Sequence, residues 1–422
     1  MITQIFRNSL TQKYRAHLYK LHSIHIYAFL LALIFIISCN GQSQSKMPND
    51  GINAPESMPS EQSEINSDSP VESNGNIHGI KNYGVSDAMR NGYLDKEGIM
   101  WFGTNNEGLY RFDGTTFTHF SERDGLCSNT INAIIEDNDG NLWFGTNEGL
   151  CRYDRKTFTH VPIPWKDTSS TWLDLVYPIV NPNEVWCLLQ DKKGDFWMGT
   201  SGGGAYRYDG DTFTSFLSNH GRKQTDSLYH NVVSSVTEDA AGNIWFTSMT
   251  HGGVSRYNGT TFTHFMPEEG LSDDMVRTSF EDRAGNIWFG SLGNRNGGLD
   301  RYDPTAAGMT GSKSQPGAQS GFTNFNETDG LCNTNVLCIY EDKTGKLWLG
   351  SGRGSMCIYD PEASLRPDGK TFEPFTTKEG QTFDNISFIS EDASGNIWFG
   401  GQYGQLFRYD GNALTNFTQK GR

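Results

Sequence analysis

The sequence predicts an all-β protein: a single seven-bladed β-propeller whose blades are four-stranded antiparallel sheets. One phrase recurs seven times with small variations, namely an acidic pair, a turn with glycine, then Trp-Phe-Gly, Arg-Tyr-Asp and Thr-Phe-Thr-His-Phe. The copies are spaced as one blade requires, at roughly 40–50 residues, and the longer copies carry insertions. The 48 glycines and the 13% of aromatic residues favour short strands joined by tight turns.

Each copy divides into four strands, as the fourth copy shows. Residues 232–238 form the inner strand, a turn around Gly242 leads to the second strand with Trp245, the third carries Arg256, and the fourth spans 262–265. A single blade cannot bury both of its faces, so blades must stack around a ring. The tryptophan at the same place in every blade is therefore expected to pack between blades: Trp101, Trp143, Trp197, Trp245, Trp288, Trp348 and Trp398.

The N-terminal region predicts export and lipid anchoring. Residues 1–38 contain four basic side chains and no acidic one, followed by an apolar run at 24–37. This run is shorter than the roughly 20 residues of a membrane span and is typical of a signal peptide. The residues Ile36-Ile37-Ser38-Cys39 resemble the lipobox of bacterial lipoproteins, which implies cleavage before Cys39 and lipidation of its thiol. The alternative is a short uncleaved anchor.

These features divide the chain into three parts. Residues 1–38 are the predicted lipoprotein signal peptide, 39–76 a disordered polar tether that begins with the lipidated Cys39, and 77–422 the propeller. We expect an outer-membrane lipoprotein of the bacterial envelope that faces the periplasm or the cell surface. Its contact with the membrane is expected through the lipid alone.

Charge and cysteine usage exclude some partners and restrict the chemistry. The formal charge is −15 and the predicted propeller contains no basic block, so nucleic acid is not an expected partner. Six cysteines lie outside the signal region. Cys338 and Cys357 are expected on the first and third strands of one blade, too far apart for a disulfide. We therefore predict buried free thiols.

Two phrases carry a resemblance to a known family. Gly140-Asn141-Leu142-Trp143-Phe144-Gly145-Thr146 and Gly149-Leu150-Cys151-Arg152-Tyr153-Asp154 recur in register over about residues 84–422. This pattern resembles the two-component regulator propeller family, found in periplasmic sensor regions of bacterial hybrid histidine kinases. The resemblance implies a sensor-like module. Family members usually carry two propellers, whereas this chain has one, and no membrane helix, kinase or DNA-binding domain is expected after Asp410.

The sequence leaves the closure of the ring open. The seventh copy ends with its own outer strand, residues 414–417. Residues 77–83 also stand where an outer strand is expected, just before Gly84-Val85-Ser86-Asp87. Either segment, or both, could complete the last blade.

Polar residues that recur in most blades are interpreted as structural, because a catalytic group is needed only once. For the recurring arginines we expect ion pairs and turn formation: Arg111, Arg152, Arg207, Arg256, Arg301 and Arg408. The Asp of each acid-plus-glycine turn is expected to cap backbone N–H groups rather than to bind calcium. His119, His160 and His264 also share one repeat position. We predict no catalytic residue, no metal site and no cofactor.

Residues outside the repeat are the candidates for function. The loops between second and third strands and the blade-to-blade connections share one face of a propeller. They contribute eight candidate ligand-binding residues: Trp165, Trp172, Tyr229, His230, His251, Arg295, Arg353 and Tyr403. Aromatic rings beside polar groups suit sugars. The alternative for Trp165 and Trp172 is that they only fix a long loop. Insertions at 304–321 and 361–370, on the opposite face, are predicted to be flexible.

The sequence thus favours a non-catalytic, sensor-like propeller outside the cytoplasm that binds an oligosaccharide or another small extracellular ligand. A second hypothesis is a platform that docks an envelope protein at the outer membrane. A third is a propeller lyase or hydrolase with an unrecognised site. A small ligand requires a concave, aromatic-lined mouth, and a platform requires a broad exposed patch.

Overall fold

The computed structural model describes residues 57–58, 79–80, 87–164, 181–217, 232–293, 297–306, 321–365, 369–401 and 404–418. All of these residues belong to one compact unit, Pro55–Arg422. Among them, no helix is both long and apolar enough to cross a membrane. The predicted signal peptide and Cys39 lie outside the described residues, as does most of the predicted tether.

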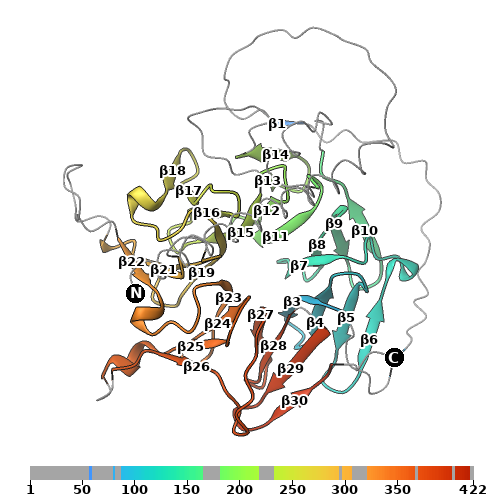
Figure 1. Ribbon diagram of the computed structural model, residues 1–422. Coiled ribbons are helices and arrows are strands. Elements are labelled where there is room, and N and C mark those ends of the chain that lie inside the picture. The colour runs from blue at the N-terminus through green and yellow to red at the C-terminus, as the bar shows by residue number, and fades with distance from the viewer. Residues whose placement is uncertain are drawn as a thin grey trace, which may run out of the picture. The chain divides into compact units, whose positions relative to one another are not determined.

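Seven antiparallel sheets, the seven blades, surround a common axis, which confirms the predicted seven-bladed propeller (Figure 1). The strands are given from the inner to the outer one. Blade 1 consists of β3 (Met89–Leu94), β4 (Met100–Thr104), β5 (Leu109–Phe112) and β6 (Phe117–Phe120), and blade 2 of β7 (Ile131–Glu136), β8 (Leu142–Thr146), β9 (Gly149–Tyr153) and β10 (Phe158–Val161). Blade 3 consists of β11 (Val185–Gln190), β12 (Phe196–Thr200), β13 (Ala205–Tyr208) and β14 (Phe213–Phe216).

The remaining four blades repeat this order. Blade 4 consists of β15 (Val233–Glu238), β16 (Ile244–Ser248), β17 (Val254–Tyr257) and β18 (Phe262–Phe265), and blade 5 of β19 (Val276–Glu281), β20 (Ile287–Ser291), β21 (Leu299–Tyr302) and β22 (Phe322–Phe325). Blade 6 consists of β23 (Val336–Glu341), β24 (Leu347–Ser351), β25 (Cys357–Tyr359) and β26 (Phe372–Pro374). Blade 7 consists of β27 (Ile386–Glu391), β28 (Ile397–Gly401), β29 (Gln405–Tyr409) and β30 (Leu414–Asn416).

Short elements complete the architecture. The 3-10 turns η1 (Glu122–Asp124), η3 (Pro267–Glu269) and η5 (Glu327–Asp329) follow the outer strands of blades 1, 4 and 5, and η6 (Pro361–Leu365) lies in blade 6. Two further strands add to outer edges: β1 (Ser57–Met58) pairs with β14, and β2 (Gly79–Ile80) pairs with β6. The pairing of β1 places two residues of the predicted tether on the edge of blade 3.

The ring closes between blades 7 and 1 without exchange of strands. Blade 7 is completed by its own β30, whereas the segment around β2 joins blade 1 and not the last blade. Phe417 packs against Phe112, Phe117 and Trp398 across the closure. Ser387 Oγ also donates to the carbonyl of Met89 at 2.7 Å. Of the two sequence alternatives, the C-terminal strand therefore completes the seventh blade, and aromatic packing holds the joint.

The seven repeat tryptophans are buried between blades, as predicted. Trp245, for example, is fully buried and packs against Phe289 and Tyr302 of the next blade. Each indole also has a fixed polar partner, because its Nε1–H donates to the Asp of the turn six residues earlier at 2.7–2.9 Å. The same Asp accepts backbone N–H groups of its turn, as Asp137 does from Asp139 and Asn141. The structural interpretation of these acids is confirmed.

The predicted ion pairs account for only some of the contacts that the recurring arginines make. The predicted pairs occur at two positions, Arg111–Asp113 at 3.9 Å and Arg207–Asp195 at 3.8 Å. The commoner contact is cation–π stacking over the indole of the same blade, at 5.5–6.0 Å, for Arg152, Arg207, Arg256, Arg301 and Arg408. Paired strands place the arginine directly opposite the tryptophan, so the indole face is its nearest partner.

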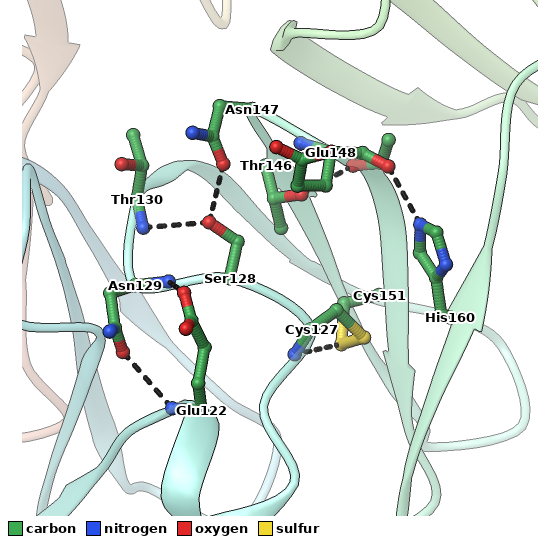
Figure 2. The surroundings of a disulfide bond; sticks show 11 residues. Glu122, Cys127, Ser128, Asn129, Thr130, Thr146, Asn147, Glu148, Cys151 and His160 are labelled. Atoms are coloured by element: carbon green, nitrogen blue, oxygen red, sulfur yellow. Dashed lines mark hydrogen bonds between the residues drawn. A yellow bond between two sulfur atoms is a disulfide. The ribbon is translucent and has the colours of Figure 1, made fainter.

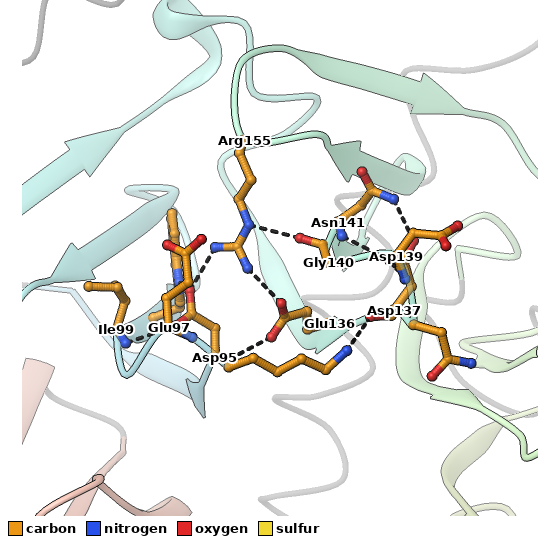
Figure 3. A network of polar contacts seen from close by, with 12 residues as sticks. Asp95, Glu97, Ile99, Glu136, Asp137, Asp139, Gly140, Asn141 and Arg155 are labelled. Atoms are coloured by element: carbon orange, nitrogen blue, oxygen red, sulfur yellow. Dashed lines mark hydrogen bonds and ion pairs between the residues drawn. The ribbon is translucent and has the colours of Figure 1, made fainter.

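Acidic side chains also join neighbouring blades. Glu136 of blade 2 accepts the backbone N–H of Lys96 in blade 1 at 2.7 Å, and the same contact recurs at the next five joints, with Gln190 as the acceptor in one of them. At the first joint Arg155 adds hydrogen bonds to Asp95 at 2.7 Å and to Glu136 at 2.9 Å (Figure 3). At the closing joint between blades 7 and 1, Leu94 occupies the position of the acid. This joint is held by aromatic packing instead of the acid-to-backbone hydrogen bond.

The prediction of free thiols is wrong for four of the six cysteines. Cys127 is bonded to Cys151 (Figure 2). Cys332 is bonded to Cys357. Cys187 and Cys338 are free, as predicted. The prediction compared cysteines on the strands of one blade and omitted the blade-to-blade connection. That connection passes over the start of the third strand, where its cysteine meets the one on β9 or β25.

Candidate functional site

The candidate site lies on the face of the ring that carries the blade-to-blade connections and the loops between second and third strands, hereafter the connection face. Its described segments include residues 121–130, 249–253, 266–275, 326–335 and 352–355. Of the eight predicted ligand-binding residues, the structure describes His251 and Arg353. The other six lie outside the described residues: Trp165, Trp172, Tyr229, His230, Arg295 and Tyr403.

His251 occupies the loop between β16 and β17. Its backbone is left-handed, with φ of 59°, which is uncommon for a residue with a Cβ. The imidazole Nδ1 lies 3.0 Å from Oδ1 of Asp274, in the connection that enters blade 5, while 64% of the side chain is exposed. The ring is thus held by one carboxylate and presents its other edge to solvent.

Arg353 lies in the loop between β24 and β25 of blade 6 and is exposed. Ser351 Oγ fixes this loop, since it donates to the carbonyl of Arg353 at 2.6 Å and accepts from its backbone N–H. Within the described residues the guanidinium has no carboxylate partner. His251 and Arg353 belong to blades 4 and 6, and no hydrogen bond or ion pair joins them, so the structure does not bring these two candidates into one cluster.

The repeated histidines have structural contacts, in agreement with the sequence interpretation. His119 and His160 each contact a backbone carbonyl of the preceding loop through Nε2, that of Glu107 and that of Glu148. His264 Nδ1 lies 2.7 Å from Ser255 Oγ.

A buried acid that sequence reasoning missed lies beneath the connection face. Asp300 of β21 is completely buried and accepts hydrogen bonds from Ser272 and Asn324. Burial raises the pKa of Asp300 to about 6, against the opposing effect of these hydrogen bonds, and the nearby Asp273 adds to the rise. One signal in the sequence could have indicated this buried acid: blade 5 has Asp at a third-strand position where blades 2 and 3 have Cys and Tyr.

A second unpredicted feature surrounds the axis of the ring. The pairing register between the first and second strands shifts by one residue in every blade, a β-bulge near the start of each inner strand. The bulged positions, hereafter the axial ring, are Arg90, Asn132, Trp186, Ser234, Arg277, Leu337 and Ser387. The inner strands contact one another cyclically and converge at the centre of Figure 1. Bulges often re-aim side chains at functional sites, and here the residue type differs from blade to blade.

Comparison with known proteins agrees with this architecture. Residues 125–148, 180–202, 270–293 and 330–353 match the family model described as two component regulator propeller. A curated histidine kinase P4 from Formosa agariphila is 26% identical over 175 residues, which are 40% of this chain and 12% of the kinase.

Solved structures give the same fold. The extracellular domain of a putative hybrid two component system from B. thetaiotaomicron is 22% identical, with a TM-score of 0.57 over 78% of this chain and 39% of that chain. A streptogramin B lyase is 13% identical, with a TM-score of 0.56 over 81% of this chain and 97% of the lyase. The chain therefore spans less than half of the kinase and of the extracellular domain that it matches. At these identities the structural likeness shows a shared propeller fold and carries no reaction or ligand with it.

Proposed function

The chain carries two-component regulator propeller repeats, and on this premise we propose that it is a non-catalytic, sensor-like propeller that binds a small extracellular ligand, with a carbohydrate as the favoured class. The ligand is bound on the connection face. The matched relatives include a histidine kinase and the extracellular domain of a putative hybrid two component system, which supports a sensor-like role.

One observation carries this proposal: the recurring polar groups have partners inside the scaffold, while two polar residues outside the repeat are exposed on the connection face. The repeat aspartates hold indoles, and the repeat histidines contact backbone carbonyls or a serine. By contrast, His251 and Arg353 are exposed residues of the connection face and have no counterparts in the repeat. Imidazole and guanidinium N–H groups suit the hydroxyl oxygens of a sugar.

Calorimetric and thermal-shift titration of the full chain tests this function. A bound oligosaccharide is expected to raise the melting temperature by a few degrees, because a ligand at 100 times its Kd adds about 2.7 kcal/mol to the stability of the native state. His251→Ala and Arg353→Ala are expected to weaken binding about tenfold. Asp211→Ala, an exposed change in a hairpin between third and fourth strands, is the matched control.

A panel of neutral and acidic oligosaccharides that leaves the melting temperature unchanged would contradict ligand sensing. Affinity capture of envelope proteins would then test the docking platform. Turnover of a panel compound would instead support the lyase or hydrolase alternative.

We further propose that the propeller is held outside the cytoplasm by a lipid on Cys39. The two disulfides support this location, because such bonds form and persist in oxidising compartments. Metabolic labelling with a palmitate analogue is expected to modify the wild-type protein and to leave Cys39→Ser unlabelled and released from the membrane fraction. Equal labelling of both proteins would contradict the anchor, and Cys187→Ser serves as the control for loss of a thiol.

A further inference from the structure

Two members of the axial ring meet across a blade. Arg277 belongs to the inner strand of blade 5 and Trp186 to that of blade 3, with blade 4 between them. Nevertheless, the guanidinium carbon of Arg277 lies 5.5 Å from the centroid of the Trp186 ring. Side chains from blades that are not neighbours can approach so closely only inside the ring of inner strands. The pair therefore lies at the axis, near the connection face where the inner strands begin.

The positive charge at the axis has no ionic partner among the described residues. Arg277 makes no ion pair and no hydrogen bond there, in contrast to Arg155, which binds two carboxylates. Burial and the charge of the nearby Arg90 lower the pKa of Arg277. Arg90 itself donates to Asn105 Oδ1, and burial lowers its pKa against the attraction of Glu184 and Asp87. Two arginines are thus close enough to repel one another in a chain of net charge −15.

An unused donor adjoins these charges. The Nε1–H of Trp186 is buried without a hydrogen-bond acceptor. All seven repeat tryptophans donate the same group to an aspartate, so Trp186 is the exception among the described indoles. A buried donor without an acceptor costs about 1–3 kcal/mol. The unpaired charge of the half-buried Arg277 adds to this cost. An oxyanion bound at this position would relieve both costs.

We propose that the axial ring binds a small organic oxyanion: a carboxylate, sulfate or phosphate group between the guanidinium groups of Arg277 and Arg90, with an apolar face against Trp186. Planar guanidinium groups bind such oxygens through paired hydrogen bonds. Indole stacks on the C–H face of a sugar ring, so an acidic saccharide fits both halves of the site. This inference rests on the proposed ligand-sensing function and specifies the ligand class and the place where it binds.

Isothermal titration of the full chain with glucuronate, glucose 6-sulfate, glucose 6-phosphate and glucose tests the site and separates the three anionic groups. We expect at least one acidic sugar to bind tenfold or more tightly than glucose, and this preference to shrink as salt is added. Arg277→Gln and Arg90→Gln are each expected to weaken the binding of that sugar at least tenfold. Arg123→Gln, an exposed arginine in η1 on the same face, is the control and should bind as the wild type does.

The stability of the variants separates a binding role from a structural one. Arg277→Gln is expected to keep the melting temperature of the unliganded chain at or above the wild-type value, because it removes an unpaired charge. A marked fall would mean that Arg277 serves the fold and would overturn the proposal, and so would acidic sugars that bind no better than glucose. Binding of a neutral oligosaccharide that is unchanged by Arg277→Gln would overturn the axial site and leave ligand sensing intact. No binding of any compound would overturn both.

Discussion

Removing both disulfide bonds is expected to lower the free energy of unfolding by about 7 kcal/mol, about 3 to 4 kcal/mol for each bond. Each bridge closes a loop with a sequence separation of 24 or 25 residues. Losing such a cross-link restores loop entropy to the unfolded chain, which by the loop-length relation is worth about 3.5 kcal/mol. The bridges belong to blades 2 and 6 and share no partner, so their effects should add. A domain of ordinary stability would lose about half of it or more.

Guanidinium unfolding of four proteins measures this effect. They are the wild type, Cys127→Ala with Cys151→Ala, Cys332→Ala with Cys357→Ala, and the combination of all four changes. Reductant should lower the unfolding midpoint of the wild type to that of the fourfold variant, which itself should not respond. Cys187→Ala with Cys338→Ala is the matched control, because these thiols are free, and it should keep the full response to reductant. A wild type whose midpoint ignores reductant would contradict the bridges.

The repeat explains why so much of the fold could be predicted. A tryptophan such as Trp245 recurs at one place because every blade must fill the same space against its neighbour, and its Asp recurs because every indole N–H needs an acceptor. Periodicity therefore fixed the number of blades and the role of the recurring acids. Periodicity did not predict the closing joint between blades 7 and 1. There Leu94 replaces the acidic residue at the end of the inner strand, and Phe417 packs against Trp398.

The disulfides were missed although the repeat contained a signal for them. Cys127 and Cys332 follow the same Asp-Gly-Leu sequence, and the same two blades carry cysteine at the matching third-strand position, Cys151 and Cys357. Blade 5 has Ser272 and Asp300 at these two positions, joined by a hydrogen bond of 2.9 Å. Comparing blades position by position, instead of strands within a blade, identifies this contact.

The candidate site was predictable only in its location on the connection face. The axial residues Arg277 and Trp186 lie on strands of different blades, so their approach depends on the closure of the ring and on the bulge that turns both side chains inward. A sequence read as separate repeats contains neither piece of information. The bulged position does stand out in one respect: its residue type changes from blade to blade, while the residue just before it is apolar in every blade.

Relative to the wild type, Asp300→Asn is expected to gain about 3 kcal/mol of stability as the pH rises from 4 to above neutral. Burial raises the pKa of Asp300 to about 6, whereas an Asp in an unfolded chain titrates near 3.9. The folded state therefore binds this proton more tightly than the unfolded chain does. The stability that this proton binding contributes is complete below about pH 4 and is lost as the pH rises through 6. A shift of about two units corresponds to about 3 kcal/mol. Asparagine has the shape of the acid and cannot ionise, and the loss of one acceptor oxygen changes the stability by an amount that does not depend on pH.

The difference in unfolding free energy between Asp300→Asn and the wild type, measured from pH 4 to pH 8, isolates this group from all others that titrate. It should grow by about 1.4 kcal/mol for each pH unit between 4 and 6 and then level off. Asp211→Asn, at an exposed position, should give a difference independent of pH. Ser272→Ala removes a hydroxyl donor to the carboxylate and should raise the pKa of Asp300 further. In that background the difference caused by Asp300→Asn should therefore level off at a higher pH. A difference for Asp300→Asn that stays constant from pH 4 to pH 8 would show that Asp300 is ionised throughout that range, and the buried acid would then need a cationic partner.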